Sequence, residues 1–453
     1  MIYILFLFAA LVGLLGGASR YDAFQIVPLR ASAALFLIPA VALLSWKKLK
    51  SETFLVCSLG ILVILVAFQL IPLPPSIWHT LPARGPIAEM DALVGDLERW
   101  RPLTLAPMRT WNALGSLIVP VAGLLLALAV GARTRKLLQI IAGLGVANAA
   151  LGLLQVVSGR SSPLYLYELT NRGSAVGLLA NENHSAVFAV CSLLVVVRLG
   201  LEAQRERQAA WLRIFYPAAF GLIFLVALVS GSRAGFAASM GAVLIAGLMV
   251  WLYRADPPRR VAAGRNVPES KATQSRLFLL LPVVAIVATV GAFIALGRLP
   301  AVQDLMARDS FADLRWSILP IIQDMAGVFW LTGTGFGSFE QVFHIFEPSS
   351  MLFERYVNQA HNDWLQIVIE GGILAVLLLA GLVAWVTIKV VRLSANREKW
   401  VAAISWIGIF GVLAAASLVD YPLRTPIFQL ATVWFLLALS REGRDLEATE
   451  PAF

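Results

Sequence analysis

Long apolar runs recur along the whole sequence and decide what this chain can fold into. A helix needs about 20 mostly apolar residues to cross the hydrocarbon core of a bilayer. Of the 453 residues, 59% are hydrophobic and 14% are charged, whereas about a quarter of the residues in an average soluble domain are charged. We therefore predict an all-α polytopic membrane protein.

The apolar runs predict about 12 transmembrane helices, with about ten as the lower bound. The predicted spans are residues 2–18, 29–45, 53–72, 112–131, 137–157, 177–197, 214–230, 234–253, 277–296, 364–388, 400–418 and 426–440. The first run has no basic residue before it and further spans follow it, so we interpret it as the first helix rather than a cleaved signal peptide. Cys57 and Cys191 fall inside predicted spans, where we expect small buried apolar residues rather than a disulfide or a metal pair.

The distribution of Lys and Arg predicts the orientation of the spans. If the N-terminus is cytoplasmic, the basic clusters at residues 47–50, 133–136 and 259–265 all fall in cytoplasmic loops, where Lys and Arg are in excess in membrane proteins. Both termini are then cytoplasmic. The net charge of +9 reflects this topology, and we do not expect the chain to bind nucleic acid.

We predict a single transmembrane domain over residues 1–440, interrupted by two long loops on the outer side at 72–110 and 297–362. Loops of that length are usually functional or disordered. The second loop, between spans 9 and 10, keeps an apolar helical periodicity at Leu314, Ile318, Ile321 and Ile322, so we expect a partly helical lid.

Two cytoplasmic segments are polar and poor in large apolar residues. We expect the loop at 254–276, which contains Asp256-Pro257-Pro258, to be a flexible connector, and residues 441–453 to be a disordered cytoplasmic tail.

The segment from Val357 to Gly372, VNQAHNDWLQIVIEGG, places ionisable groups at and inside the start of a span. Such groups cost about 2.5 kcal/mol or more within a membrane and usually have a function. On a helix, the spacing of Asn362, Gln366 and Glu370 makes one polar stripe leading down from His361, so we expect this helix to line a polar cavity. The alternative is that the polar residues at its start only cap a membrane helix at the headgroups.

Polar motifs in other parts of the chain fall at the same, outer end of their predicted helices. They are Asn181, Glu182, Asn183 and His184; Ser230, Ser232 and Arg233; His361, Asn362 and Asp363; and Asp420, Tyr421 and Arg424. The predicted inner ends carry Lys and Arg but almost no His, Asn or Asp. We therefore predict one polar site at the outer membrane face.

Arg233 and Arg315 are the candidate phosphate-binding residues of this site. The planar guanidinium makes paired, charge-assisted hydrogen bonds to phosphate oxygens and stays charged at any relevant pH. Gly231 and Gly235 flank Arg233 and permit close approach of a ligand to the backbone. The alternative for Arg233 is an anchor at the lipid headgroups, and for Arg315 the sequence favours neither interpretation.

His361 is the candidate general base, because an unperturbed imidazole titrates near ~6.5 and can accept a proton from a sugar hydroxyl. His184 is the second candidate. No Ser-His-Asp or Cys-His arrangement indicates a covalent acyl-enzyme. The run Gly333-Thr334-Gly335-Phe336-Gly337 lacks the GxGxxG spacing of nucleotide-binding loops, and we interpret it as a flexible loop that shapes the lid.

Together, these motifs resemble the superfamily of O-antigen ligases and O-antigen polymerases, bacterial membrane enzymes that transfer glycans. The resemblance is strongest over a core at residues 177–390. It is carried by Asn181 to His184, by Ser230-Gly-Ser-Arg233-Ala-Gly235, by Arg315-Trp316 with Gly333 to Phe339, and by His361-Asn-Asp-Trp-Leu365 with Glu370-Gly371-Gly372. The stretch from Gln69 to Pro74 is also similar to members of this family.

The resemblance implies inverting, metal-independent glycosyl transfer without a cofactor, at the periplasmic face of the bacterial inner membrane. The implied donor is a glycan linked to undecaprenyl diphosphate. Arg233 and Arg315 would hold the diphosphate, and His361 would activate the acceptor hydroxyl. Glu182 and Glu370 would orient His184 or His361.

The acceptor stays open, because the shared motifs do not separate the branches of the superfamily. A ligase would use lipid A core, a polymerase a second lipid-linked glycan, and related enzymes a protein. The ligase is the leading interpretation. The alternative from another class is a secondary transporter, although carriers usually place polar residues near the midplane in repeated halves. A structural membrane scaffold is a third interpretation.

Overall fold

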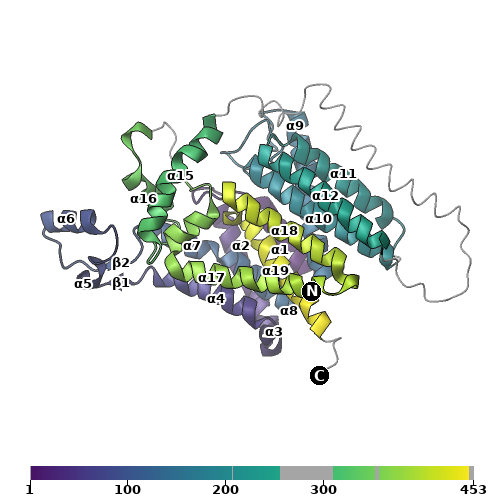
Figure 1. The fold of residues 1–453 in the computed structure, drawn as a ribbon, viewed down its shortest axis with the longest axis horizontal. Helices are drawn as coiled ribbons and strands as arrows, with labels where there is room; N and C mark the ends of the chain where they lie inside the picture. The colour runs from purple at the N-terminus through teal and green to yellow at the C-terminus, as the bar shows by residue number, and fades with distance from the viewer. Residues whose placement is uncertain (1, 207, 256–309, 352–356, 448–453) are drawn as a thin grey trace, which may run out of the picture.

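The computed structural model describes residues 2–206, 208–255, 310–351 and 357–447. In these residues the fold is helical apart from one two-stranded sheet (Figure 1). The predicted span at 277–296 and most of the predicted connector at 254–276 lie outside the described residues.

Eight of the described helices are long and apolar enough to cross a membrane. They are α2 (Ile26–Leu43), the stretch of α7 (Pro107–Ser116) and α8 (Ile118–Val130), α9 (Thr134–Ser158), α10 (Glu182–Arg205), α11 (Leu212–Val229), α12 (Arg233–Ala255), α17 (Asp363–Ser394), and α18 (Trp400–Val419) with the short η2 (Arg397–Lys399) before it. The membrane class is confirmed, and the total of about 12 spans stays a prediction.

Three further apolar helices fall where spans were predicted. α1 (Ile2–Leu15) and α4 (Thr53–Phe68) are shorter than a full crossing, and α19 (Pro426–Glu447) covers the last predicted span. The five-residue α3 (Trp46–Lys50) precedes α4 and carries three lysines.

Helix α10 lies at the centre of the bundle, packed against α9, α11, α12 and α18. Small residues allow this close packing: a Cβ on Gly145 of α9 would lie 2.3 Å from the Cβ of Ser192, and a Cβ on Gly408 of α18 would lie 2.8 Å from Leu194. A continuous apolar core surrounds it. This central helix therefore holds its first turn, with His184, in a fixed position.

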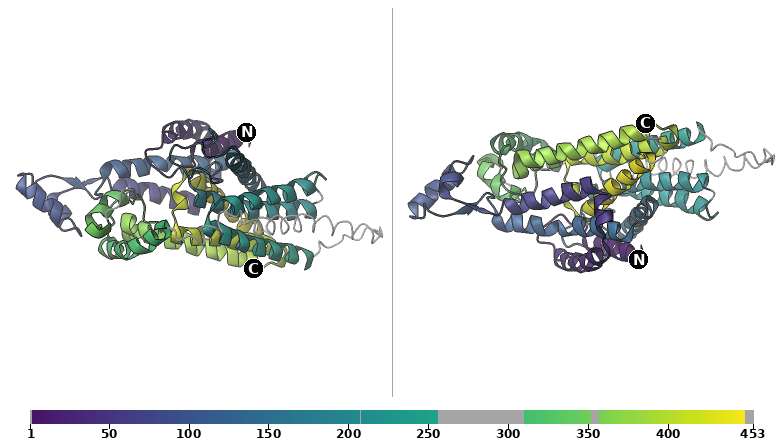
Figure 2. Two further views of the ribbon diagram at one scale, coloured as in Figure 1. Left: turned by 90° about the horizontal axis from the view of Figure 1, so that it is seen from above. Right: turned by 90° about the horizontal axis from the view of Figure 1, so that it is seen from below.

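The described residues of the two long loops form a cap at one end of the bundle, on the left of Figure 1. The first contains β1 (Pro72–Leu73), α5 (Pro75–Trp78), α6 (Gly85–Leu93) and β2 (Arg101–Pro102). The strands pair antiparallel, with Pro72 opposite Pro102. Both views in Figure 2 keep the cap at this end.

The second loop contains α15 (Ser310–Phe329), α16 (Phe339–Phe346) and the short η1 (Ser349–Met351). Helices therefore occur in the described residues of this loop, and the partly helical lid stays a prediction. Ile318 and Ile322 are buried in a second apolar cluster that includes Ile369 of α17, so the cap packs directly on the start of α17.

Ion pairs fix the opposite end of the bundle. Glu52, just before α4, pairs with Arg441 and Arg444 of α19, and Arg198 of α10 pairs with Glu442. The disordered tail predicted from residue 441 is therefore wrong through Glu447, because these ion pairs anchor the last turns of α19; residues 448–453 lie outside the described part of the chain.

Candidate functional site

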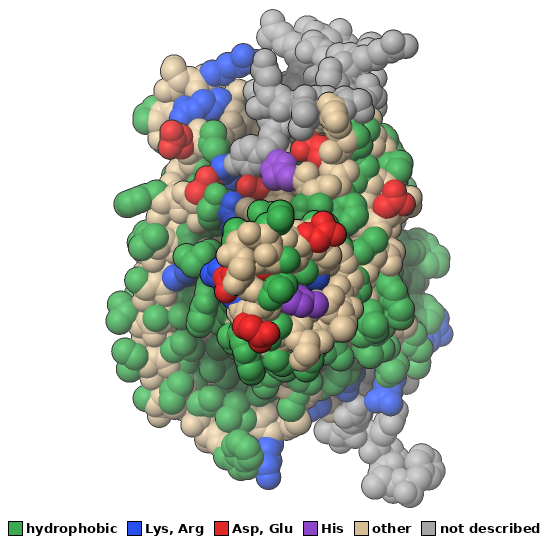
Figure 3. Space-filling view, turned by 90° about the vertical axis from the view of Figure 1, so that its left-hand side faces the viewer, with side chains coloured by type: hydrophobic (Ala, Val, Ile, Leu, Met, Phe, Trp, Pro, Cys, Tyr) green, Lys and Arg blue, Asp and Glu red, His purple; other side chains and the backbone are tan. Residues whose placement is uncertain are grey.

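A buried carboxylate, Asp420, lies at the centre of the polar cluster at the cap end of the bundle. Its Oδ1 is 3.4 Å from Nε2 of His184 and 3.8 Å from Nδ1 of His361, and its Oδ2 is 3.6 Å from Nη2 of Arg315. The three neighbours come from α10, from the residue before the α17 cap, and from α15. Figure 3 looks onto the surface of this end, where acidic, basic and histidine side chains lie among hydrophobic ones.

Local backbone features place these groups. Asn181 caps α10 by accepting hydrogen bonds from the amides of Asn183 and His184, and Asn362 caps α17 by accepting one from Leu365. Asp420 follows the last residue of α18 in an extended conformation. His361 adopts a left-handed backbone conformation, with φ of 49°, which is uncommon outside glycine and is often retained at functional sites.

Aromatic contacts and charge define the electrostatics of the cluster. The Tyr421 ring lies edge-on to both imidazoles, with centroids 5.2 Å from His184 and 5.0 Å from His361. Burial acts to raise the pKa of Asp420, but the imidazoles of His184 and His361 outweigh it and hold that pKa well below its usual range. The neighbours of Asp420 therefore favour its anionic form.

A second buried network lies beside the first and is built on Arg424. Its Nε donates to Oδ1 of Asp363 at 3.2 Å, and its Nη2 donates to Oε2 of Glu370 at 3.1 Å. Ser417 donates to the other oxygen of Asp363, and Gln366 donates to Oε1 of Glu370 at 3.0 Å. These interactions compensate both carboxylates.

This network corrects two predictions. Gln366 and Glu370 do share one helix face, but both side chains are 0% exposed and bond to protein groups such as the amides of Ala360 and Phe339. They do not line a cavity. Glu370 pairs with Arg424 instead of orienting His361, and the carboxylate beside both histidines is Asp420.

The glycine-rich loop at 333–337 fixes a bend in α17. Gly372 has a φ of 61° within that helix, and the amides of Thr334 and Gly335 donate to the carbonyls of Ile369 and Glu370. Gln69 joins them, donating to the carbonyl of Glu370 and accepting from the amide of Phe336. Instead of the flexible loop that we expected, this loop is tied to α17 by backbone hydrogen bonds.

The remaining predicted residues lie around the first turn of α12. Arg233 is its first residue and is half-buried. Ser232 caps the helix by accepting from the amide of Gly235. Glu182 bonds with Asn171, and a Cβ on Gly231 would lie 3.3 Å from its carboxylate, so Glu182 lies beside the turn before α12.

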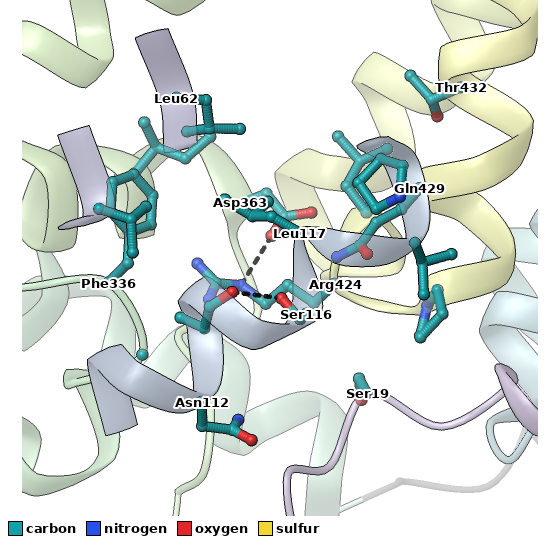
Figure 4. A pocket seen from close by; sticks show the side chains of 18 of the residues that line it. Ser19, Leu62, Asn112, Ser116, Leu117, Phe336, Asp363, Arg424, Gln429 and Thr432 are labelled. Atoms are coloured by element: carbon teal, nitrogen blue, oxygen red, sulfur yellow. Dashed lines mark hydrogen bonds and ion pairs between the residues drawn. The ribbon is translucent and has the colours of Figure 1, made fainter. Parts of the chain in front are cut away.

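A cavity of about 400 Å³ adjoins the polar networks (Figure 4). Its walls include Asp363, Arg424 and Gln359 at one end, and leucines of α4, α8, α17 and α19 along its length. None of His184, Arg233, Arg315, His361 and Asp420 lines it.

The structure therefore assembles three predicted residues, His184, Arg315 and His361, around a residue that was not assigned a role. The sequence contained a signal for Asp420, an acidic residue directly after an apolar run. It could not show that this residue meets three side chains from distant elements. Among the described residues, no group of three His, Cys, Asp or Glu side chains could hold a metal ion.

Comparison with known proteins gives one further finding. The family model described as O-antigen ligase matches residues 218–380. The matched range contains Arg233, Arg315, His361 and Glu370 and ends before Asp420. No curated protein matches the chain.

Proposed function

Because residues 218–380 match the family model described as O-antigen ligase, we propose that this chain is a membrane glycosyltransferase. It moves a glycan from undecaprenyl diphosphate to an acceptor hydroxyl at the periplasmic face of the inner membrane, with inversion and without a metal ion. The observation that carries the proposal is the cluster of two histidines and an arginine around the buried carboxylate of Asp420.

His361 acts as the general base in this proposal. Its imidazole takes the proton of the acceptor hydroxyl while the hydroxyl oxygen forms a bond to the anomeric carbon of the donor sugar. The bond from that carbon to the diphosphate breaks, and its electron pair leaves on the diphosphate. Attack opposite to the leaving group inverts the anomeric centre. Asp420 then stabilises the imidazolium, as a buried carboxylate does beside a catalytic histidine.

Arg233 and Arg315 neutralise the charge that develops on the diphosphate. Fixed cations stabilise such charge most in a site from which water is excluded, so the arginines serve where a metal ion would otherwise be needed. Nε of Arg315 is buried and has no hydrogen-bond partner among the described residues. This supports a role as donor to a substrate oxygen.

The first test replaces the proposed base. We expect His361→Ala to abolish glycan transfer in cells while the protein stays at parental abundance, as seen in a gel profile of surface and lipid-linked polysaccharide. His344→Ala is the matched control, because His344 lies on the exposed face of α16 and bonds only Glu347 among the described residues. Normal transfer in the His361→Ala strain would show that His361 is not the base.

The same gel identifies the acceptor. Full-length lipid-linked polymer that never reaches lipid A would indicate a ligase, and accumulated single repeat units would indicate a polymerase. An unchanged profile on deletion of the gene, together with loss of uptake of a labelled solute, would support the transporter interpretation instead.

The second test changes the geometry of a cation and keeps its charge. Cells complemented with Arg233→Lys should transfer glycan at least about tenfold more slowly than cells with the parent. The reason is that lysine cannot make the paired hydrogen bonds of arginine. Initial rates of polymer formation in complemented cells measure this. A lysine variant as fast as the parent would rule out paired binding of the diphosphate by Arg233.

A further inference from the structure

The cavity described above is long and narrow. Its wall on α17 runs from Asp363 to Leu382, which at 1.5 Å per residue is roughly 28 Å of helix, close to the thickness of the hydrocarbon core. The volume over this length is about 400 Å³, near the lower end of the range for small-ligand sites. Spread over this length, that volume matches the cross-section of one hydrocarbon chain lying along α17.

The two ends of the cavity differ in chemistry. Leu55, Leu59, Leu382 and Leu436 contribute to its apolar length, and the arginines, Asn112, Ser116 and Gln359 gather at the cap end. Figure 4 shows Asn112, Ser116 and Arg424 on one part of the lining and Leu62 on another. An apolar channel with a polar, cationic mouth matches a lipid with an anionic head.

Arg30 supplies the charge that distinguishes the mouth. It lies in the second turn of the candidate span α2, lines the cavity, and donates from Nη2 to the carbonyl of Asn112 at 2.9 Å. Among the described residues it pairs with no carboxylate, whereas Arg109 pairs with Glu340 and Arg424 with Asp363 and Glu370. A cation inside a membrane span usually has a partner or a function, so an anionic ligand would complete this site.

The cavity is also separate from the proposed donor site. Asp363 and Arg424 line the cavity and bond to each other, whereas none of Asp420, His184, His361 and Arg315 is among the lining residues. His361 is two residues from Asp363 along the chain, so a lipid head at the mouth would bring its sugar near the proposed base.

We infer that this cavity binds a second substrate, a glycan acceptor carried on a single-chain polyprenyl phosphate lipid, with its phosphate on Arg30. The inference rests on the proposed function, and it narrows the acceptor to a lipid-linked glycan. Lipid A, which carries several acyl chains, does not fit so narrow a channel. The reaction is then a transfer between two lipid-linked glycans.

The test counts lipids bound to the purified full-length protein. Native mass spectrometry with added undecaprenyl diphosphate as the probe should find two bound molecules on the parent, one on Arg30→Gln and one on Leu59→Trp, which fills the channel without touching a charge. The controls are Arg213→Gln and Leu244→Trp. Both positions are exposed on the outside of the bundle, on α11 and α12, and both controls should still bind two.

Several results would overturn the inference. One bound lipid on the parent, or two on both Arg30→Gln and Leu59→Trp, would remove the second site. If hexa-acyl lipid A bound the parent but neither Arg30→Gln nor Leu59→Trp, the cavity would bind lipid A, and the proposed polyprenyl-linked acceptor would be wrong. Lipid counts do not depend on transfer, so an inactive enzyme that still binds two lipids would contradict the proposed function and leave the cavity assignment standing.

Discussion

At the scale of single residues, Asp420 has the largest set of functional neighbours. It contacts two imidazoles and one guanidinium, each from a different element, and it is 3% exposed. A buried carboxylate that interacts with several side chains at a site fixes their positions. We therefore interpret Asp420 as a positioning residue for His361, the proposed base, and for Arg315, which is proposed to bind the diphosphate.

We expect Asp420→Asn to lower the rate of glycan transfer about 100-fold, because the amide keeps the shape but loses the charge that stabilises the imidazolium. Transfer by purified protein in proteoliposomes measures the rate. Asp324→Asn on the exposed face of α15 is the matched control and should leave it unchanged.

A positioning role also predicts which kinetic constants change in the Asp420→Asn variant. The kcat should fall, the KM for the donor should change less, and the dependence of the rate on pH should change shape. A variant that folds, keeps the parental rate and keeps the parental pH profile would contradict the role of Asp420.

At the scale of elements, the bend in α17 determines where the site lies. Gly372 has φ of 61° and ψ of −162°, a region open almost only to glycine. A Cβ there would lie 2.7 Å from the amide nitrogen of Gly333 and the carbonyl oxygen of Leu331. The first turns of α17, with Asp363 and Glu370, are thus held in place by the glycine-rich loop.

Gly372→Ala should destabilise the protein by about 2 kcal/mol or more, because both the backbone conformation and the contact with Gly333 become unfavourable. Thermal melting in detergent, followed by fluorescence-detected size exclusion, measures the loss. Gly381→Ala in the same helix, where a Cβ meets nothing within 4 Å, is the control. Equal melting temperatures for the two variants would contradict the proposed strain at the bend.

The sequence predicted the elements of this site better than their contacts. Periodicity placed Ile318 and Ile322 on the buried face of the lid helix, as the structure confirms. The stripe of Gln366 and Glu370 was also correct as a helix face. The pairing of Glu370 with Arg424 could not be predicted. Arg424 is 54 residues further along the chain than Glu370, and the two side chains meet only after α17, α18 and α19 have packed.

At the scale of the whole molecule, the two ends of the bundle have different tasks. The cap end gathers the histidines, the glycine-rich loop and the mouth of the cavity. The opposite end holds ion pairs that join α10, α4 and α19. Composition and apolar runs predicted the membrane class and most helices, whereas the pairing of Arg198 with Glu442 depends on tertiary packing and was not predicted.

Glu442→Gln should therefore lower stability by about 1–3 kcal/mol, because the buried Arg198 loses its carboxylate partner on α19 and keeps the ion pair with Glu202. Melting in detergent measures the change, with the exposed Glu398→Gln as control. Transfer per folded molecule should stay within about twofold of the parent at low temperature, since the pair lies at the end away from the cluster. A selective loss of transfer without loss of stability would show that this end takes part in the reaction.

The most direct test of the proposed glycan transfer is an assay of the purified protein itself. Parent and His361→Ala would be reconstituted in proteoliposomes with an undecaprenyl-diphosphate-linked glycan and each acceptor in turn, and released undecaprenyl diphosphate would be measured together with the elongated or transferred glycan. We predict equal amounts of the two products from the parent, and neither above background from His361→Ala. Product formation at the parental rate by His361→Ala, or none by a folded parent with any acceptor, would contradict the assignment of this chain as a glycosyltransferase with His361 as its base.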